Sequence, residues 1–153
     1  MTMRLGVAVA LDGPEAEATA ATVVEQAAVW AVRTQGVLDL LFVEGPDYAT
    51  QWIADATVRA MVEQEARVLR AERRARLDAL LGAIPEGHQG IVEVLAGDAV
   101  EALVEVGTRY DALLLATHGR QGLDRLWSGS TAEQVVRRAP CPVLVMRLPA
   151  ASA

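Results

Sequence analysis

The sequence predicts a single α/β domain over residues 1–148: a five-stranded parallel sheet with helices on both faces. Short apolar runs alternate along the chain with longer segments of helical periodicity, and glycine or proline stands where segments end. The short runs are apolar throughout, which is typical of strands that are buried on both faces. This doubly wound arrangement predicts the strand order 3-2-1-4-5. Residues 149–153 are expected to form a flexible tail.

The first half of the chain predicts two strands and two helices. Residues 5–11 form a short apolar run that Asp12, Gly13 and Pro14 close with a turn. Apolar positions recur at helical spacing over residues 16–33, and Gly36 ends that helix. The second strand is expected at residues 37–43. A long helix follows at residues 49–81, and we interpret the arginine and glutamate side chains of residues 63–76 as a solvated face.

The second half continues the alternation. A third strand is expected at residues 91–95, and Asp98 is a suitable N-cap for a helix over residues 99–109. A fourth strand at 113–116, a loop, a helix at 130–138 and a fifth strand at 142–146 complete the domain. Ligands of such sheets bind beyond the carboxyl ends of the strands, where the strand order reverses. We therefore expect a site in the loops after the first, second and fourth strands.

Composition excludes several classes of protein. The 153 residues carry a net charge of −6 and no lysine, so no nucleic-acid partner is expected, because such binding depends on phosphate neutralisation. Cys141 is the single cysteine, which excludes a disulfide framework and a cysteine-based zinc site and indicates a reducing compartment. No apolar run is long enough to span a membrane and no signal peptide is recognisable. We therefore expect a cytoplasmic protein without membrane contact.

The segment from residue 117 to residue 131 carries the strongest chemical signal. A P-loop is impossible without lysine, and no Gly-x-Gly-x-x-Gly follows the first strand. Instead, Gly119 and Gly129 allow close approach to the backbone, and Ser130 and Thr131 stand at the start of a helix. Free N–H groups and hydroxyls at a helix start form a plausible phosphate cradle. The alternative is a capping box of Ser130 with Glu133, and the two uses are compatible.

These features resemble the universal stress protein family over nearly the whole chain. Its ATP-binding members carry Gly-x-x-Gly, nine residues, and Gly-Ser or Gly-Thr; here Gly119, nine residues and Gly129-Ser130 match the later part. Segments 9–13, 40–43, 111–119 and 140–145 resemble the family's strands and loops. The resemblance implies an adenine nucleotide alpha hydrolase-like fold, bound ATP with Mg²⁺, and a homodimer formed through the last strand.

The resemblance also implies roles for individual residues of this chain. Asp12, preceded by Ala10 and Leu11, would lie beside the adenosine, and Val43 would contact adenine through its backbone. Ribose and phosphates would be lined by Ala116, His118 and Gly119, and phosphate oxygens would be bound by Gly129, Ser130 and Thr131. The chain departs from the family pattern at two positions. Ala116 replaces the first glycine, where a methyl group could crowd the ribose or strain the backbone, and Pro14 removes a hydroxyl and an N–H.

The leading hypothesis is therefore an ATP-binding universal stress protein that acts as a stress-response or signalling module. One alternative is a family member that binds no nucleotide and acts as a dimer through protein partners; Ala116 and Pro14 favour it. Another is a slow ATPase or phosphotransferase that uses Ser130 or Thr131. His118 has no nucleophile partner in the sequence pattern, so no catalytic residue is assigned, and no intrinsic metal site is expected.

Overall fold

The expected sheet is present in the computed structural model, which describes residues 1–11, 16–45, 50–118 and 129–148. Five strands, all parallel in their pairings, lie in the order β3-β2-β1-β4-β5. Their bounds are β1 (Arg4–Val9), β2 (Val37–Glu44), β3 (Gln89–Ala96), β4 (Ala112–His118) and β5 (Val143–Leu148). The α/β fold class and the 3-2-1-4-5 order predicted from the sequence are confirmed.

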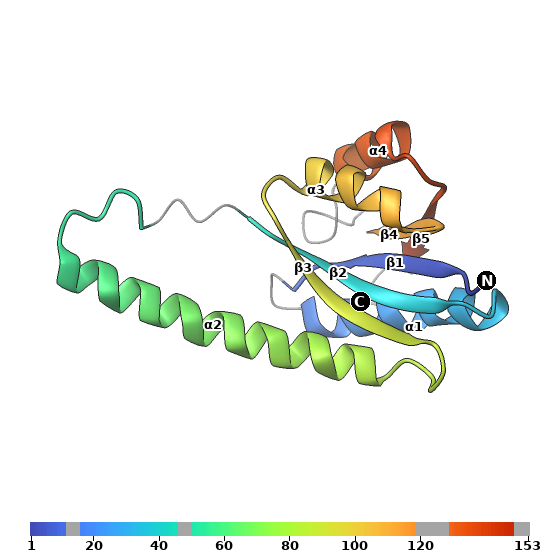
Figure 1. Cartoon of the computed structure of the whole chain (residues 1–153), viewed down its shortest axis with the longest axis horizontal. Helices are drawn as coiled ribbons and strands as arrows, with labels where there is room; N and C mark the ends of the chain where they lie inside the picture. Colours follow the sequence, from blue (N-terminus) through green and yellow to red (C-terminus); the bar gives the residue numbers. More distant parts are fainter. Residues whose placement is uncertain (12–15, 46–49, 119–128, 149–153) are drawn as a thin grey trace.

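Helices cover both faces of the sheet (Figure 1). α1 (Ala16–Arg33) and α2 (Ala56–Gly82) lie on one face; α3 (Ala99–Val106), the 3-10 turn η1 (Gly107–Arg109) and α4 (Gly129–Arg138) lie on the other. Each face has its own core. Val7, Leu40 and Leu114 point toward α1 and α2, whereas Leu41 and Leu115 point toward α3 and α4, as the alternation of strand side chains requires.

The largest departure from the sequence-based expectation is the start of α2. The helix begins at Ala56, not at residue 49, because Asp55 is its N-cap. The Asp55 carboxylate accepts hydrogen bonds from the backbone N–H groups of Thr57 and Val58, at 2.8 and 3.0 Å, which satisfies two of the otherwise free donors at a helix start. The amino-terminal half of α2 extends beyond the sheet (Figure 1), and Leu77, near its other end, is buried.

Candidate functional site

At the carboxyl end of the sheet, strand pairing stops earlier in the middle than at the sides, and we call this place the notch. The central strand β1 pairs with β2 as far as Val9 and with β4 only as far as Val7. The flanking strands run further: β2 continues along β3 to Glu44, and β4 continues along β5 to His118. Because neighbouring strands lie about 4.8 Å apart, the walls that β2 and β4 form are about 10 Å apart. The notch lies where the strand order reverses, the expected place for a ligand.

Val43 turns its carbonyl into the notch from the β2 side. Along a parallel strand, the peptide groups of alternate residues face opposite neighbours. Val37 N–H donates to the Met3 carbonyl at 2.8 Å, so the odd-numbered residues of β2 face β1. Val43 is therefore β1-facing, but the pairing of β2 with β1 ends at Phe42. This orientation is what backbone contact with a ligand in the notch requires.

Ala116 turns its peptide group toward the notch from the opposite wall. Leu113 N–H donates to the Pro142 carbonyl of the β5 side at 2.9 Å, so by the same alternation Ala116 faces β1. Ala116 is 0% exposed as a whole residue and packs in the core on the α1 side. Among the non-glycine residues that the structure describes, positive φ occurs at Gln35 alone, so Ala116 carries no such strain. Ala116 is therefore fully buried, with its methyl group in the core and its peptide group on the side of β1.

The other predicted residues lie around the same edge of the sheet where the structure describes them. Ala10 and Leu11 follow β1 at the base of the notch, and Leu11 packs into the core on the α1 side. His118 is the last residue of β4. Asp12 and Gly119 lie outside the described residues, so their predicted roles stay predictions.

The amino end of α4 also lies at the carboxyl end of the strands. α4 connects β4 to the parallel strand β5, so it begins at the edge where β4 ends. Gly129 and Ser130 form its first residues, and Thr131 is half-buried in its first turn. The Glu133 carboxylate pairs with Arg137 one turn further on, at 2.7 Å. The first turn of α4 carries the positive end of the helix dipole, which favours anions.

A groove of about 360 Å³ lies on the α2 side of the β2 end. Glu44 points into it, and its Oε1 accepts hydrogen bonds from Arg70 Nε at 3.1 Å and Arg73 Nη1 at 2.9 Å. The Arg73 guanidinium also lies over the ring of Phe42, 5.0 Å from its centroid. From the sequence, these arginines were interpreted as part of a solvated face. Their pairing with Glu44 was missed because Glu44 lies 26 and 29 residues away along the chain.

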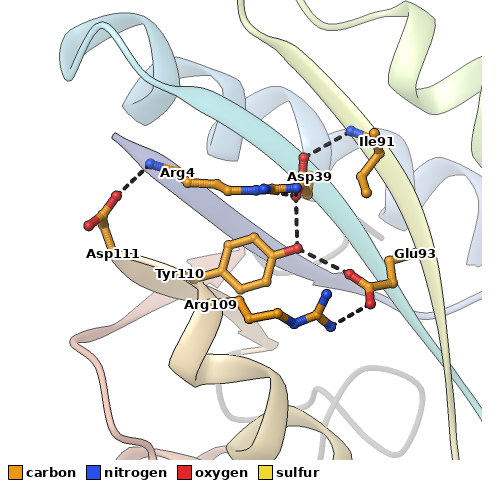
Figure 2. A network of polar contacts seen from close by, with 7 residues as sticks. All are labelled: Arg4, Asp39, Ile91, Glu93, Arg109, Tyr110 and Asp111. Carbon is orange, nitrogen blue, oxygen red and sulfur yellow. Dashed lines mark hydrogen bonds and ion pairs between the residues drawn. The ribbon is translucent and has the colours of Figure 1, made fainter. Parts of the chain in front are cut away.

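A polar network occupies the opposite edge of the sheet, near the amino ends of the strands (Figure 2). Its centre is Asp39 on β2, which is 1% exposed. Asp39 Oδ2 accepts hydrogen bonds from Arg4 Nε at 2.9 Å and from the Tyr110 hydroxyl at 2.8 Å, and its Oδ1 accepts one from Ile91 N–H at 2.9 Å. A buried carboxylate needs such partners, because its desolvation is costly.

Glu93 and Arg109 form an ion pair on the solvent side of this network. Burial above all, then the hydrogen bond to Asp39, raises the pKa of Tyr110, so the phenol stays a donor. Gly90 leaves no room for a ligand: a Cβ there would lie 1.9 Å from Asp39 Oδ1. The network therefore fills its space with mutually paired groups, and we interpret it as structural. The only sequence signal was one acidic residue inside an apolar run.

Other candidate chemistry is sparse in the part of the chain that the structure describes. Burial raises the pKa of the half-buried Cys141 thiol, which disfavours the reactive thiolate. Within the described ranges, no three histidine, cysteine or acidic side chains gather in a way that could hold a metal ion. No helix in those ranges combines the length and apolarity needed to cross a membrane.

Almost the whole chain matches one known protein family. The sequence profile of the universal stress protein family matches residues 3–147. The chain belongs to the universal stress protein family. A family relative from Thermus aquaticus, the universal stress protein in the QAH/OAS sulfhydrylase 3′ region, is 31% identical over 109 residues, which are 67% of this chain and 69% of that protein. Universal stress protein MJ0531 of Methanocaldococcus jannaschii is 39% identical over 59 residues, 37% of this chain and 35% of that protein.

Several solved structures share the fold of this chain. UspA from Lactobacillus plantarum has a TM-score of 0.61 at 25% identity, over 95% of this chain and 97% of that one. Hypothetical protein MJ0577 has a TM-score of 0.68 at 18% identity, over 97% and 98% of the two chains. A universal stress protein in complex with cAMP has a TM-score of 0.53 at 20% identity, also over 97% and 98%. At 18% and 20% identity, these last two show a common fold and no more.

Proposed function

We propose that this universal stress protein binds ATP, with Mg²⁺, in the notch and acts in the cytoplasm as a nucleotide-dependent stress-response module. The observation that carries the proposal is the pair of notch walls. Val43 and Ala116 turn backbone groups toward the place where β1 stops pairing with its two neighbours. Adenine is planar and has hydrogen-bonding groups along its edge, so it suits such a gap better than a bulky apolar ligand does.

The start of α4 supports the phosphate half of the proposal. Gly129, Ser130 and Thr131 open a ten-residue helix at the same edge of the sheet as the notch. The N–H groups and the dipole of a helix start favour anions. Mg²⁺ would enter with the phosphates, since its ligands at such sites are largely phosphate oxygens and waters. One structural neighbour is described as a universal stress protein in complex with cAMP, which is also an adenine nucleotide.

Calorimetry with millimolar Mg-ATP tests this function, and we expect saturable heat that disappears in Gly129→Val. A β-branched side chain at Gly129 would block approach of phosphate to the first turn of α4. Gly82→Val is the matched control, because a Cβ at Gly82 meets nothing within 4 Å at the far end of α2. Absence of heat with the folded parent protein, or equal loss of binding in both variants, would contradict the proposal.

We also propose that the protein forms a homodimer through β5. The strand lies at one edge of the sheet, and Val145 is 42% exposed. Because Leu113 N–H bonds to the Pro142 carbonyl, alternation turns the peptide groups of Leu144 toward β4 and those of Val145 outward. Two such edges can meet about a twofold axis and satisfy each other's groups.

A further inference from the structure

One face of α2 carries large apolar side chains at its amino end and small ones at its carboxyl end. The amino half of the helix extends beyond the sheet (Figure 1), and there Val58 and Met61 are 48% and 68% exposed. Continued in steps of three and four residues, their row runs through positions 65, 68, 72 and 76 to Ala79 and Ala83. Residues at this spacing lie on one face of a helix. We call this row the outer face of α2.

The alanine end of the outer face borders an apolar cleft of about 340 Å³. The α2 side chains that line the cleft are Ala75, Arg76, Ala79, Leu80 and Ala83, and Leu11 contributes from the end of β1. The methyl groups of the alanines are short, so a larger apolar side chain has room to enter between α2 and Leu11. Methionine is well suited to such a place, because its unbranched side chain adapts to irregular gaps.

Two copies of α2 that lie antiparallel bring the large end of one outer face to the cleft of the other. If Val58 of one copy lies opposite Ala83 of the other, then Met61 lies opposite Leu80, because both helices rise equally per residue. The same contact forms a second time with the copies exchanged. Both exposed side chains of each copy therefore reach an apolar cleft of about 340 Å³ in this one arrangement.

Charge favours the same arrangement. The register that joins Val58 to Ala83 also places Glu65 opposite Arg76, and both belong to the outer face. Residues 55–65 contain three acidic side chains and one arginine, whereas residues 67–76 contain five arginines and one glutamate. An antiparallel pair sets the acidic half of each helix against the basic half of the other, and a parallel pair would set like charge against like charge.

We infer that the outer face of α2 binds the same face of a second copy of this chain, antiparallel, about a twofold axis. Because each copy inserts Val58 and Met61 into the cleft of the other, the contact is self-complementary and closes. Two large apolar side chains bury well under the about 800 Å² that each partner of a stable complex buries. The contact is therefore transient, forms between the proposed β5 dimers, and leaves the mass of dilute protein unchanged.

Oxidative cross-linking tests the contact, because a disulfide traps a transient pair. We expect the variant Met61→Cys with Ala79→Cys to form a covalent two-chain species on a non-reducing gel after oxidation with copper phenanthroline. Each single variant controls for pairing through the native Cys141. Val32→Cys with Ala79→Cys is the matched control, since Val32 is 45% exposed on a different helix, α1. Equal cross-linking in the single variants or in this control would overturn the inference.

Reversing charges in the double-cysteine protein tests the register. Glu65→Arg sets like charges opposite each other and should slow cross-linking by about fivefold or more. Adding Arg76→Glu should restore the rate, and an unchanged rate in Glu65→Arg would overturn the inference. If circular dichroism shows that Arg76→Glu unfolds the protein, Glu65→Arg alone decides. Val145→Pro should leave cross-linking intact, because the contact lies away from the β5 edge; its loss there would also overturn the inference.

Discussion

Replacing Asp39 with asparagine tests whether the network at the amino end of the sheet is structural. The substitution keeps the shape of the side chain and an oxygen that can still accept from Ile91 N–H. It places an NH₂ donor where Asp39 Oδ2 now accepts from Arg4 at 2.9 Å and from the Tyr110 hydroxyl at 2.8 Å. The Arg4 donor would then face an NH₂ donor, and the Tyr110 hydroxyl would lose its charged acceptor, at a side chain that is 1% exposed.

The expected cost follows from the exposure of each partner. Arg4 is 49% exposed and can be rehydrated, so losing its ion pair costs at most about 1 kcal/mol. The Tyr110 hydroxyl is buried, and losing its hydrogen bond to a charged acceptor costs about 1.5–2 kcal/mol. Together these predict that Asp39→Asn lowers the free energy of unfolding by about 1.5–3 kcal/mol, or the melting temperature by about 3–12 °C.

Urea unfolding followed by circular dichroism at pH 7 measures the change, with Asp78→Asn as the control. Asp78 is exposed and pairs with Arg74 four residues earlier on the same helix, so its neutralisation should cost less than about 0.5 kcal/mol. ATP affinity should stay unchanged in both variants, because Asp39 lies at the edge of the sheet remote from the notch. A loss below 0.5 kcal/mol for Asp39→Asn, or lost ATP binding in a stable variant, would refute the structural interpretation.

Three further predictions concern the remaining features. Burial raises the pKa of Tyr110, so the stabilisation that its neutral phenol provides is complete below the unfolded-state pKa of about 10 and is lost as the pH rises above it. The free energy of unfolding of the parent protein should therefore fall at alkaline pH, and this fall should be absent in Tyr110→Phe. Ala116→Gly should destabilise the protein by about 1 kcal/mol, since a core methyl group is removed; tighter ATP binding would mean instead that the methyl group crowds the ligand. In light scattering, the parent protein should have the mass of a dimer of 16.3 kDa chains, and Val145→Pro should have the mass of one chain. A folded Val145→Pro variant that is still dimeric would place the interface elsewhere.

The fold could be predicted from the sequence because its signals are local. Apolar runs such as residues 37–43, and the glycine and proline residues that end the segments, can be recognised from a few consecutive residues. The start of α2 was missed because the composition of residues 49–55 is compatible with a helix. The sequence alone does not show which acidic residue of this region is the N-cap, which the structure places at Asp55.

The site was only partly predictable because its determinants are long-range. The resemblance directed attention to Val43 and Ala116, but the direction of their peptide groups depends on strand register, which no local pattern records. The Glu44 ion pairs cross 26 and 29 residues, and Asp39 and Tyr110 are 71 residues apart. Pairs of that kind become visible only when the sheet is assembled.

The short central strand has a consequence for how this protein avoids aggregation. A strand end with free peptide groups usually invites a foreign strand, and edge strands such as β5 present those groups outward along their length. At the carboxyl end, β2 and β4 extend past the point where β1 stops pairing with them. Because these strand ends lie between neighbours inside the sheet, a foreign strand cannot pair along them as it can along the edge strand β5. The interruption in pairing therefore lies at a place that is less open to strand addition than β5 is.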